Sequence, residues 1–98
     1  MKFTQIIEFT TRQIDEFNAN LDDWMARSEG HRIPHRAVLR SDRDAANVYL
    51  LMVEFSSYDQ GMENSSRPET GEFAAFLAGI SDGPLTFRNL DVLREEDL

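Results

Sequence analysis

Hydrophobic and polar residues alternate over residues 3–9, and a spacing of two predicts a strand at the start of the chain. Phe3, Ile7 and Phe9 share one face of this strand, whereas Glu8 lies on the other. The apolar face is the one that a covering helix would bury.

Apolar residues then recur every three or four positions, which predicts a helix that ends near Gly30. Thr10 followed by Gln13 has the form of a capping box, so we expect the helix to begin there. The stripe that would face the core comprises Ile14, Phe17, Leu21, Trp24, Met25 and Ser28.

Two strands follow the helix. Residues 31–42 predict a strand with Pro34 near its start, which suits an edge position. Residues 48–55 form the most continuous apolar run, and a run that is apolar on both faces is typical of a central strand covered on both sides. The turn at 41–46 allows two registers between the two strands.

The second half of the chain predicts a broken helix and a final strand. A capping box at Ser57 and Gln60 opens a short helix, and a second box at Ser66 and Glu69 restarts it after an interruption. The buried stripe of the restarted helix comprises Phe73, Phe76, Leu77 and Ile80. Residues 85–93 are the last strand.

The order of elements is βαββαβ, the split β-α-β arrangement of the ferredoxin-like α+β fold, with a four-stranded antiparallel sheet and the helices on one face. The helices leave the other sheet face open, yet residues 48–55 are apolar on both sides. A second copy of the sheet is the simplest cover, so we expect a homodimer of the dimeric α/β-barrel type. The length fits one domain spanning residues 1–98.

Composition narrows the class of protein. The chain has no cysteine, which excludes disulfides, thiolate metal sites and a cysteine nucleophile. It starts without a signal-peptide pattern and has no apolar run near the roughly 20 residues of a membrane span, so we expect a cytoplasmic protein. The net charge of −8, from 18 acidic and 10 basic residues, disfavours nucleic acid and anionic membranes as partners.

The chain resembles the dimeric α/β-barrel superfamily, in particular the antibiotic-biosynthesis-monooxygenase-like (ABM-like) proteins. The resemblance rests on the element order, on residues 49–55 and on the interrupted helix of residues 57–73. It implies a homodimer with a pocket between sheet and helices. It also implies a cofactor-independent, monooxygenase-like enzyme that acts on a small aromatic or apolar molecule. The alternative is a non-catalytic dimer that binds a small ligand or another protein.

The resemblance also separates branches of the family. Haem-degrading members depend on an asparagine in the first strand and a Trp–His pair in the second half. This chain has Gln5 in the first strand, its only tryptophan is Trp24, and no histidine follows His35, so haem degradation is disfavoured and no cofactor is expected. Quinone-forming oxygenases tend to use a Trp or Asn near the second helix, which Asn64 matches.

Two carboxylates are candidates for acid–base catalysis. The first and third strands each end with a glutamate one residue before a phenylalanine. If these strands are parallel central neighbours, Glu8 and Glu54 lie side by side on the face opposite the helices. Paired carboxylates in a poorly hydrated space raise each other's pKa, as general acid–base catalysis can require. Alternatively Arg36, Arg40 or Arg88 neutralises them.

Other polar residues are candidates for a site. His31 and His35 are four residues apart, but four residues of strand span about 13 Å, so no metal site is expected. His35 alone is either a general base or an exposed edge histidine. Tyr58, Asn64 and Arg67 lie at the helix break, where a cleft could bind a polar or aromatic ligand. Alternatively, Tyr58 packs while the other two cap the break.

Overall fold

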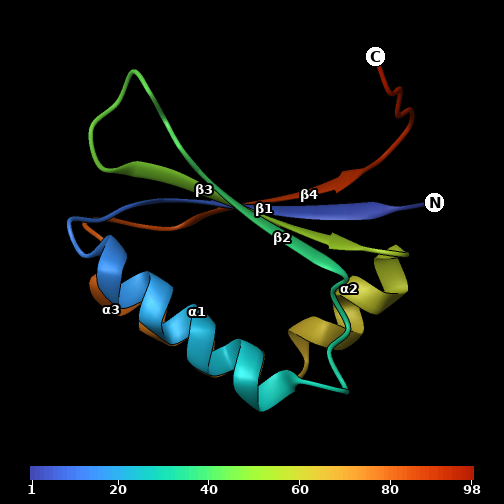
Figure 1. Ribbon diagram of the computed structural model, residues 1–98, viewed down its shortest axis with the longest axis horizontal. Helices are drawn as coiled ribbons and strands as arrows, with labels where there is room; N and C mark the ends of the chain where they lie inside the picture. Colours follow the sequence, from blue (N-terminus) through green and yellow to red (C-terminus); the bar gives the residue numbers. More distant parts are fainter.

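The computed structural model describes residues 1–98, which fold around one four-stranded sheet (Figure 1). In chain order the elements are β1 (Phe3–Thr10), α1 (Ile14–Ser28), β2 (Arg36–Ser41), β3 (Val48–Phe55), α2 (Tyr58–Ser65), α3 (Pro68–Ile80) and β4 (Thr86–Asp91). The strand order is β2-β3-β1-β4, and every neighbouring pair is antiparallel. The predicted ferredoxin-like α+β fold is therefore confirmed.

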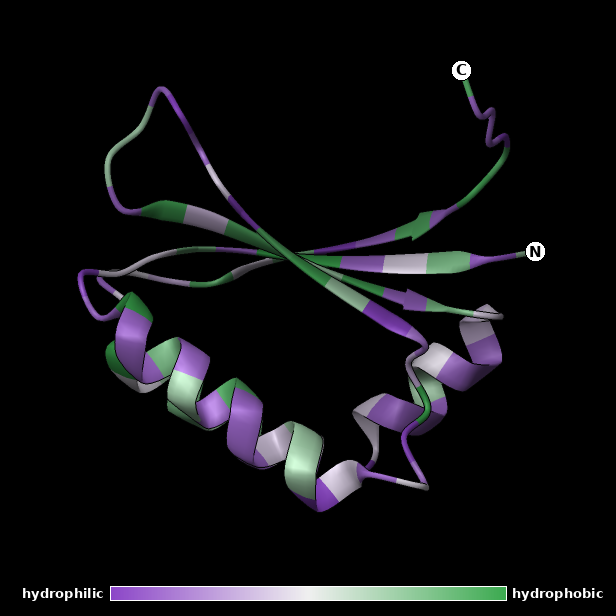
Figure 2. Ribbon diagram, viewed as in Figure 1, coloured by the Kyte–Doolittle hydropathy of each residue, from purple (hydrophilic) through white to green (hydrophobic).

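All three helices lie on one face of the sheet, and the core fills the space between the two layers (Figure 1). The buried hydrophobic residues are Phe3, Ile7, Phe9, Phe17, Leu51, Phe55 and Leu77. Figure 2 shows hydrophobic residues gathered at the centre of the sheet, whereas the C-terminal tail is largely hydrophilic. The alternation in β1 and β3 thus sets which side chains reach the helices, as expected. None of the helices has the length and apolar character needed to cross a membrane.

The strand predicted for residues 31–42 is shorter than expected, because residues 29–35 form a loop before β2 begins at Arg36. Gly30 has a φ of +86°, a left-handed conformation that turns the chain out of α1. Pro34 has no N–H to donate to a neighbouring strand, and pairing starts only where His35 N donates to Glu54 O at 3.0 Å. The last strand is also shorter than predicted.

One of the three predicted capping boxes supplies the expected cap. The hydroxyl of Ser57 accepts a hydrogen bond from Gln60 N at 3.2 Å at the start of α2. Ser66 instead donates its hydroxyl to Glu63 O at 2.7 Å, so it closes α2 and does not open α3. Arg67, in extended backbone, precedes α3 without a side-chain cap.

The capping box predicted at Thr10 does not form, and α1 begins after Gln13 without a side-chain cap. Thr10 is still paired with Val48 in the sheet, so its hydroxyl is not at the helix start. Thr11 is buried and accepts a hydrogen bond from Gln13 N at 3.0 Å. It also donates to Ile80 O at 2.6 Å, which joins the start of α1 to the end of α3.

The helix-free face of the sheet is defined by the strand registers. Its three rows, written from β2 to β4, are Arg36, Glu54, Thr4 and Leu90; Val38, Met52, Ile6 and Arg88; and Arg40, Leu50, Glu8 and Thr86. This register decides which arginine lies beside Glu54, a question that the sequence left open. Arg36 lies opposite Glu54, and the two form a salt bridge of 3.5 Å between Nε and Oε2.

Glu8 and Glu54 both lie on the helix-free face, but the prediction that they lie side by side is wrong. The two strands are antiparallel, so Glu8 is opposite Leu50 whereas Glu54 is opposite Thr4. Four residues of strand, about 14 Å, separate the two rows. The two carboxylates therefore do not form a pair that could share a proton.

The buried stripe of α3 differs from the prediction at one position. Leu77 is fully buried, and Phe73 and Ile80 pack against the core. Phe76 is only half-buried and lies outside the core cluster. The core-facing stripe of α3 therefore comprises positions 73, 77 and 80 and does not include Phe76.

Gly61 allows α2 to approach the sheet, because a Cβ at this position would lie 2.6 Å from Cε2 of the buried Phe3. We expect Gly61→Ala to destabilise the protein by about 1–3 kcal/mol through overpacking. Gly71 in α3 has open space around it, so Gly71→Ala should stabilise by about 0.5–1 kcal/mol through helix propensity. Denaturant titration of both variants measures the difference. Equal effects at the two glycines would contradict this close approach.

Candidate functional site

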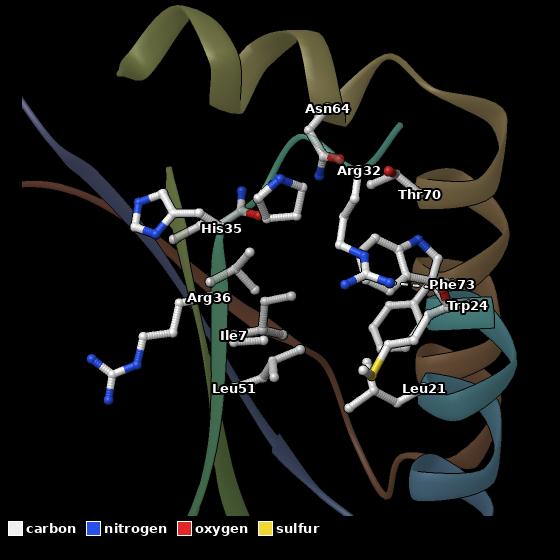
Figure 3. A pocket seen from close by; sticks show the side chains of 15 residues that line it. Ile7, Leu21, Trp24, Arg32, His35, Arg36, Leu51, Asn64, Thr70 and Phe73 are labelled. Atoms are coloured by element: carbon white, nitrogen blue, oxygen red, sulfur yellow. Dashed lines mark hydrogen bonds between the residues drawn. The ribbon is translucent and has the colours of Figure 1, made fainter. Parts of the chain in front are cut away.

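A cavity of about 280 Å³ lies between the helices and the helix-covered face of the sheet (Figure 3). Its apolar walls include Ile7, Leu51 and Val53 from the sheet and Leu21, Trp24 and Phe73 from the helices. The polar residues along it are Gln5, Arg32, His35, Arg36, Asn64 and Thr70. No aspartate or glutamate lines this cavity.

Asn64 projects from the last turn of α2 into the cavity (Figure 3). The residue is 8% exposed, and its amide forms no hydrogen bond with another protein group. The amide atoms keep some contact with solvent, because Thr70 Oγ1 is the one fully buried side-chain polar atom without a partner. Asn64 therefore offers two N–H donors and one carbonyl acceptor to whatever enters the cavity.

Thr70, in the first turn of α3, carries a second unpartnered polar group at the same end of the cavity (Figure 3). Its hydroxyl oxygen is buried and has no hydrogen-bond partner. Thr70 was not predicted to belong to a site, although the sequence contains a signal for it. Thr70 lies three residues before Phe73, so the buried stripe of α3 extends back onto a polar residue.

Trp24 was predicted to be core, but it forms part of the cavity wall together with Arg32. The Arg32 guanidinium lies 5.6 Å from the centre of the indole ring. It donates from Nε to Ser28 Oγ at 3.2 Å and from Nη2 to Met25 O at 2.8 Å, which ties it to the end of α1. Arg32 was not predicted to belong to a site, because it lies within the strand expected for residues 31–42.

His35 lines the cavity at the start of β2, but its imidazole is exposed and points away from Trp24 and Phe73 (Figure 3). The His31 ring forms a 3.1 Å hydrogen bond with Arg27 O outside the cavity. No group of three or more histidine, aspartate or glutamate side chains has the geometry to hold a metal ion. The histidines therefore do not join the polar end formed by the helices.

Tyr58 and Arg67 were predicted to bind a ligand beside Asn64, but the structure places neither along the cavity. Tyr58 is 52% exposed and packs edge-on against Phe3, with ring centroids 5.3 Å apart. Arg67 donates to His31 O at 2.7 Å, so it joins the break between α2 and α3 to the loop of residues 29–35. Of the three residues, only Asn64 lines the cavity.

Arg27 connects α1 with α3 through Glu72 at 3.1 Å and also pairs with Asp23 at 2.9 Å. The hydrogen bond with Glu72 and the charge of Asp23 raise the pKa of Arg27. The pKa of Lys2 is likewise raised, by its hydrogen bond to Glu95 and the charge of that carboxylate. A base with a raised pKa loses its contribution only as pH rises through that value, so both links persist at neutral pH.

Solved structures with this fold include several antibiotic biosynthesis monooxygenases. SnoaB from Streptomyces nogalater, a cofactor-independent oxygenase crystallised as an asparagine-to-alanine variant, superposes with a TM-score of 0.79 at 18% identity, covering 96% of this chain and 95% of SnoaB. Rv0793 from Mycobacterium tuberculosis gives a TM-score of 0.77 at 17% identity, covering 99% and 100% of the two chains. A further antibiotic biosynthesis monooxygenase gives 0.72 at 8% identity, covering 94% of this chain and 99% of that one.

No protein-family model and no curated protein matches the sequence. Because the identities are low, the similarity establishes the fold. The chain has the ABM-like form of the ferredoxin-like fold, as the sequence resemblance implied.

Proposed function

We propose that this protein is a cofactor-independent, monooxygenase-like enzyme that acts on a small aromatic molecule in the cavity. The observation that carries this proposal is the pair of unpartnered polar groups, Asn64 and Thr70, at one end of a cavity whose walls include aromatic and aliphatic side chains. An interior filled by side chains would favour a non-catalytic dimer instead. The shared fold of SnoaB, a cofactor-independent oxygenase, supports the same proposal.

The cavity suits a phenol, that is, an aromatic ring with a hydroxyl group attached to it. The ring packs between the aromatic side chains of Trp24 and Phe73 and the aliphatic side of the sheet at Leu51. The phenolic oxygen then accepts hydrogen bonds from Asn64 and Thr70. These donors stabilise the oxyanion that forms when the phenol loses its proton, because preorganised donors that face the developing charge need no reorganisation during the reaction. The phenolate is more electron-rich than the neutral phenol and passes an electron to O₂ more readily.

The reaction of such a substrate needs no external reductant. With 1-naphthol as the example, O₂ delivers one oxygen atom to the ring carbon para to the hydroxyl, and the other oxygen leaves as water. The water takes the hydroxyl hydrogen and the hydrogen of that ring carbon, and the product is 1,4-naphthoquinone. The four electrons that reduce O₂ come from the naphthol itself.

Oxygen uptake with 1-naphthol and 1,5-dihydroxynaphthalene, measured with a chelator and without added cofactor, tests the proposal. We expect enzyme-dependent uptake of O₂ in equal amount to the quinone that forms. Binding of both compounds without oxygen uptake would contradict catalysis and would favour the alternative, a non-catalytic ligand-binding module.

We also propose that residues 1–98 form one ABM-like domain that pairs with a second copy through the helix-free face of the sheet. The apolar residues on this face are Ile6, Val38, Val48, Leu50, Met52 and Leu90. Around them Glu8, Arg40 and Arg88 form no salt bridge within the chain, so they are free to pair with opposite charges of a partner subunit. Two such faces could bury about 1,500 Å² in total, enough for a stable dimer. A chain without cysteine suits the reducing cytoplasm, where we place it.

Light scattering should therefore give twice the 11.3 kDa mass of one chain at micromolar concentration. We expect Ile6→Asp to give monomers, because it places a charge in the middle row of the proposed interface. Asn18→Asp, on the exposed side of α1, adds the same charge elsewhere and should leave the dimer intact. A mass of one chain for the unmodified protein would refute the dimer.

A further inference from the structure

The charge of the cavity is opposite to that of the chain. The protein has a net charge of −8, yet the ionised side chains along the cavity are two arginines, Arg32 and Arg36. Arg36 directs its side chain away from Trp24 and Phe73 (Figure 3) and pairs with Glu54 at 3.5 Å. Arg32 forms no salt bridge, so it is the uncompensated cation of the site.

Arg32 is also held in a fixed position. Its Cζ lies over the indole ring of Trp24, and its bonds to Ser28 Oγ and Met25 O use two of the five N–H donors of a guanidinium. The remaining donors are available to a ligand without further ordering of the side chain. A preorganised guanidinium matches the planar fork of a carboxylate.

We infer that the cavity takes a planar aromatic acid, with its carboxylate on Arg32 and its ring beside Trp24 and Phe73. This inference rests on the proposed function and narrows its substrate class to anions. A volume of about 280 Å³ is at the lower end of ligand pockets, about 300–1,000 Å³, which favours one or two fused rings. Asn64 and Thr70 remain available for a second oxygen substituent, the one at which oxidation would begin.

A role of Arg32 in capping α1 alone would explain its two protein hydrogen bonds, but it would not select the charge of a ligand. A binding experiment that compares a charged with a neutral ligand therefore distinguishes a capping role of Arg32 from a ligand-binding role. 2-Naphthoate and 2-naphthamide share the same ring system and nearly the same shape, and only the first is anionic at neutral pH. Trp24 is the only tryptophan, so its indole N–H gives a single reporter signal in ¹⁵N–¹H spectra.

We expect 2-naphthoate to bind at least about tenfold more tightly than 2-naphthamide, since a hydrogen bond to a charged group is the stronger one. Added salt should weaken the binding of the anion more than that of the amide. Arg32→Gln should lower the affinity for 2-naphthoate by about tenfold and change that for 2-naphthamide by less than about twofold. Arg43→Gln removes the same charge from the exposed loop between β2 and β3. It should leave the ratio of the affinities for the two ligands unchanged.

Thermal unfolding of each variant checks that Arg32→Gln still folds, and the comparison of the two ligands on the unmodified protein does not depend on that variant. Equal affinity for both ligands would overturn the inference and leave the proposed function standing. If Arg43→Gln lowers the ratio of the affinity for 2-naphthoate to that for 2-naphthamide as much as Arg32→Gln does, the assignment to Arg32 is overturned. If neither ligand shifts the Trp24 signal, both the inference and the aromatic-ligand function are overturned.

Discussion

Asn64→Ala should lower the rate of oxygen uptake with 1-naphthol by about 100-fold or more, because it removes the donors aimed at the oxyanion. The side-chain amide has no partner in the protein, so its removal breaks no hydrogen bond of the fold. We therefore expect the free energy of unfolding to change by less than about 1 kcal/mol. Oxygen-electrode rates and denaturant titration measure the two effects.

Asn64→Asp is the matched control for this prediction. It keeps the size of the side chain but replaces its N–H donors with a carboxylate, which repels an oxyanion. We expect it to be at least as inactive as the alanine variant. Thr70→Val, which removes only a hydroxyl, should have a smaller effect of about 10-fold. Full activity of Asn64→Ala would show that the amide does not stabilise the reacting oxygen.

Phe17→Ala should destabilise the protein by about 3–5 kcal/mol. Phe17 is 0% exposed and lies at the centre of the core, where it stacks on Phe9 at 5.2 Å and meets Phe73 edge-on at 5.8 Å. Removing its ring leaves a cavity that these aromatic neighbours cannot fill without moving. Denaturant titration followed by circular dichroism measures the loss.

Phe87→Ala is the control for the stability prediction, because it removes the same side chain from β4, an edge strand. Phe87 is 50% exposed, so its loss should cost less than about 1 kcal/mol. Equal losses at Phe17 and Phe87 would contradict the position of the core between the helices and the sheet.

The helix-facing and helix-free sides of the central strands could be read from the sequence because each strand alternates locally. Phe3 and Phe9 on one side and Glu8 on the other follow from a period of two, whatever the rest of the chain does. The cap at Ser57 was predicted for the same reason, since its partner, Gln60, is three residues away. Side-chain bonds that depend on other elements were not predicted: Thr11, just before α1, is positioned by its bond to Ile80 O, 69 residues away.

The candidate site was less accessible to sequence reasoning, because it combines residues from three strands, three helices and the loop of residues 29–35. Asn64 could be singled out from its place at the helix break and from the family resemblance. Thr70 lies on a buried helical stripe, so a polar residue there was a readable signal. Arg32 gave no such signal, because its position depends on how the loop of residues 29–35 folds back onto Trp24.

The sequence by itself determined the order of the elements, the inward faces of the strands and an apolar β3 suited to the middle of a sheet, because these properties depend on spacing within each segment. Only the tertiary structure decided which residues meet across segments. Antiparallel pairing, which the order of the elements already implied, separates Glu8 from Glu54, whereas no local pattern encodes the register that places Arg36 opposite Glu54. The cavity likewise brings together Trp24 of α1, Phe73 of α3 and Leu51 of β3, which are far apart in the sequence and meet only through the packing of helices on the sheet.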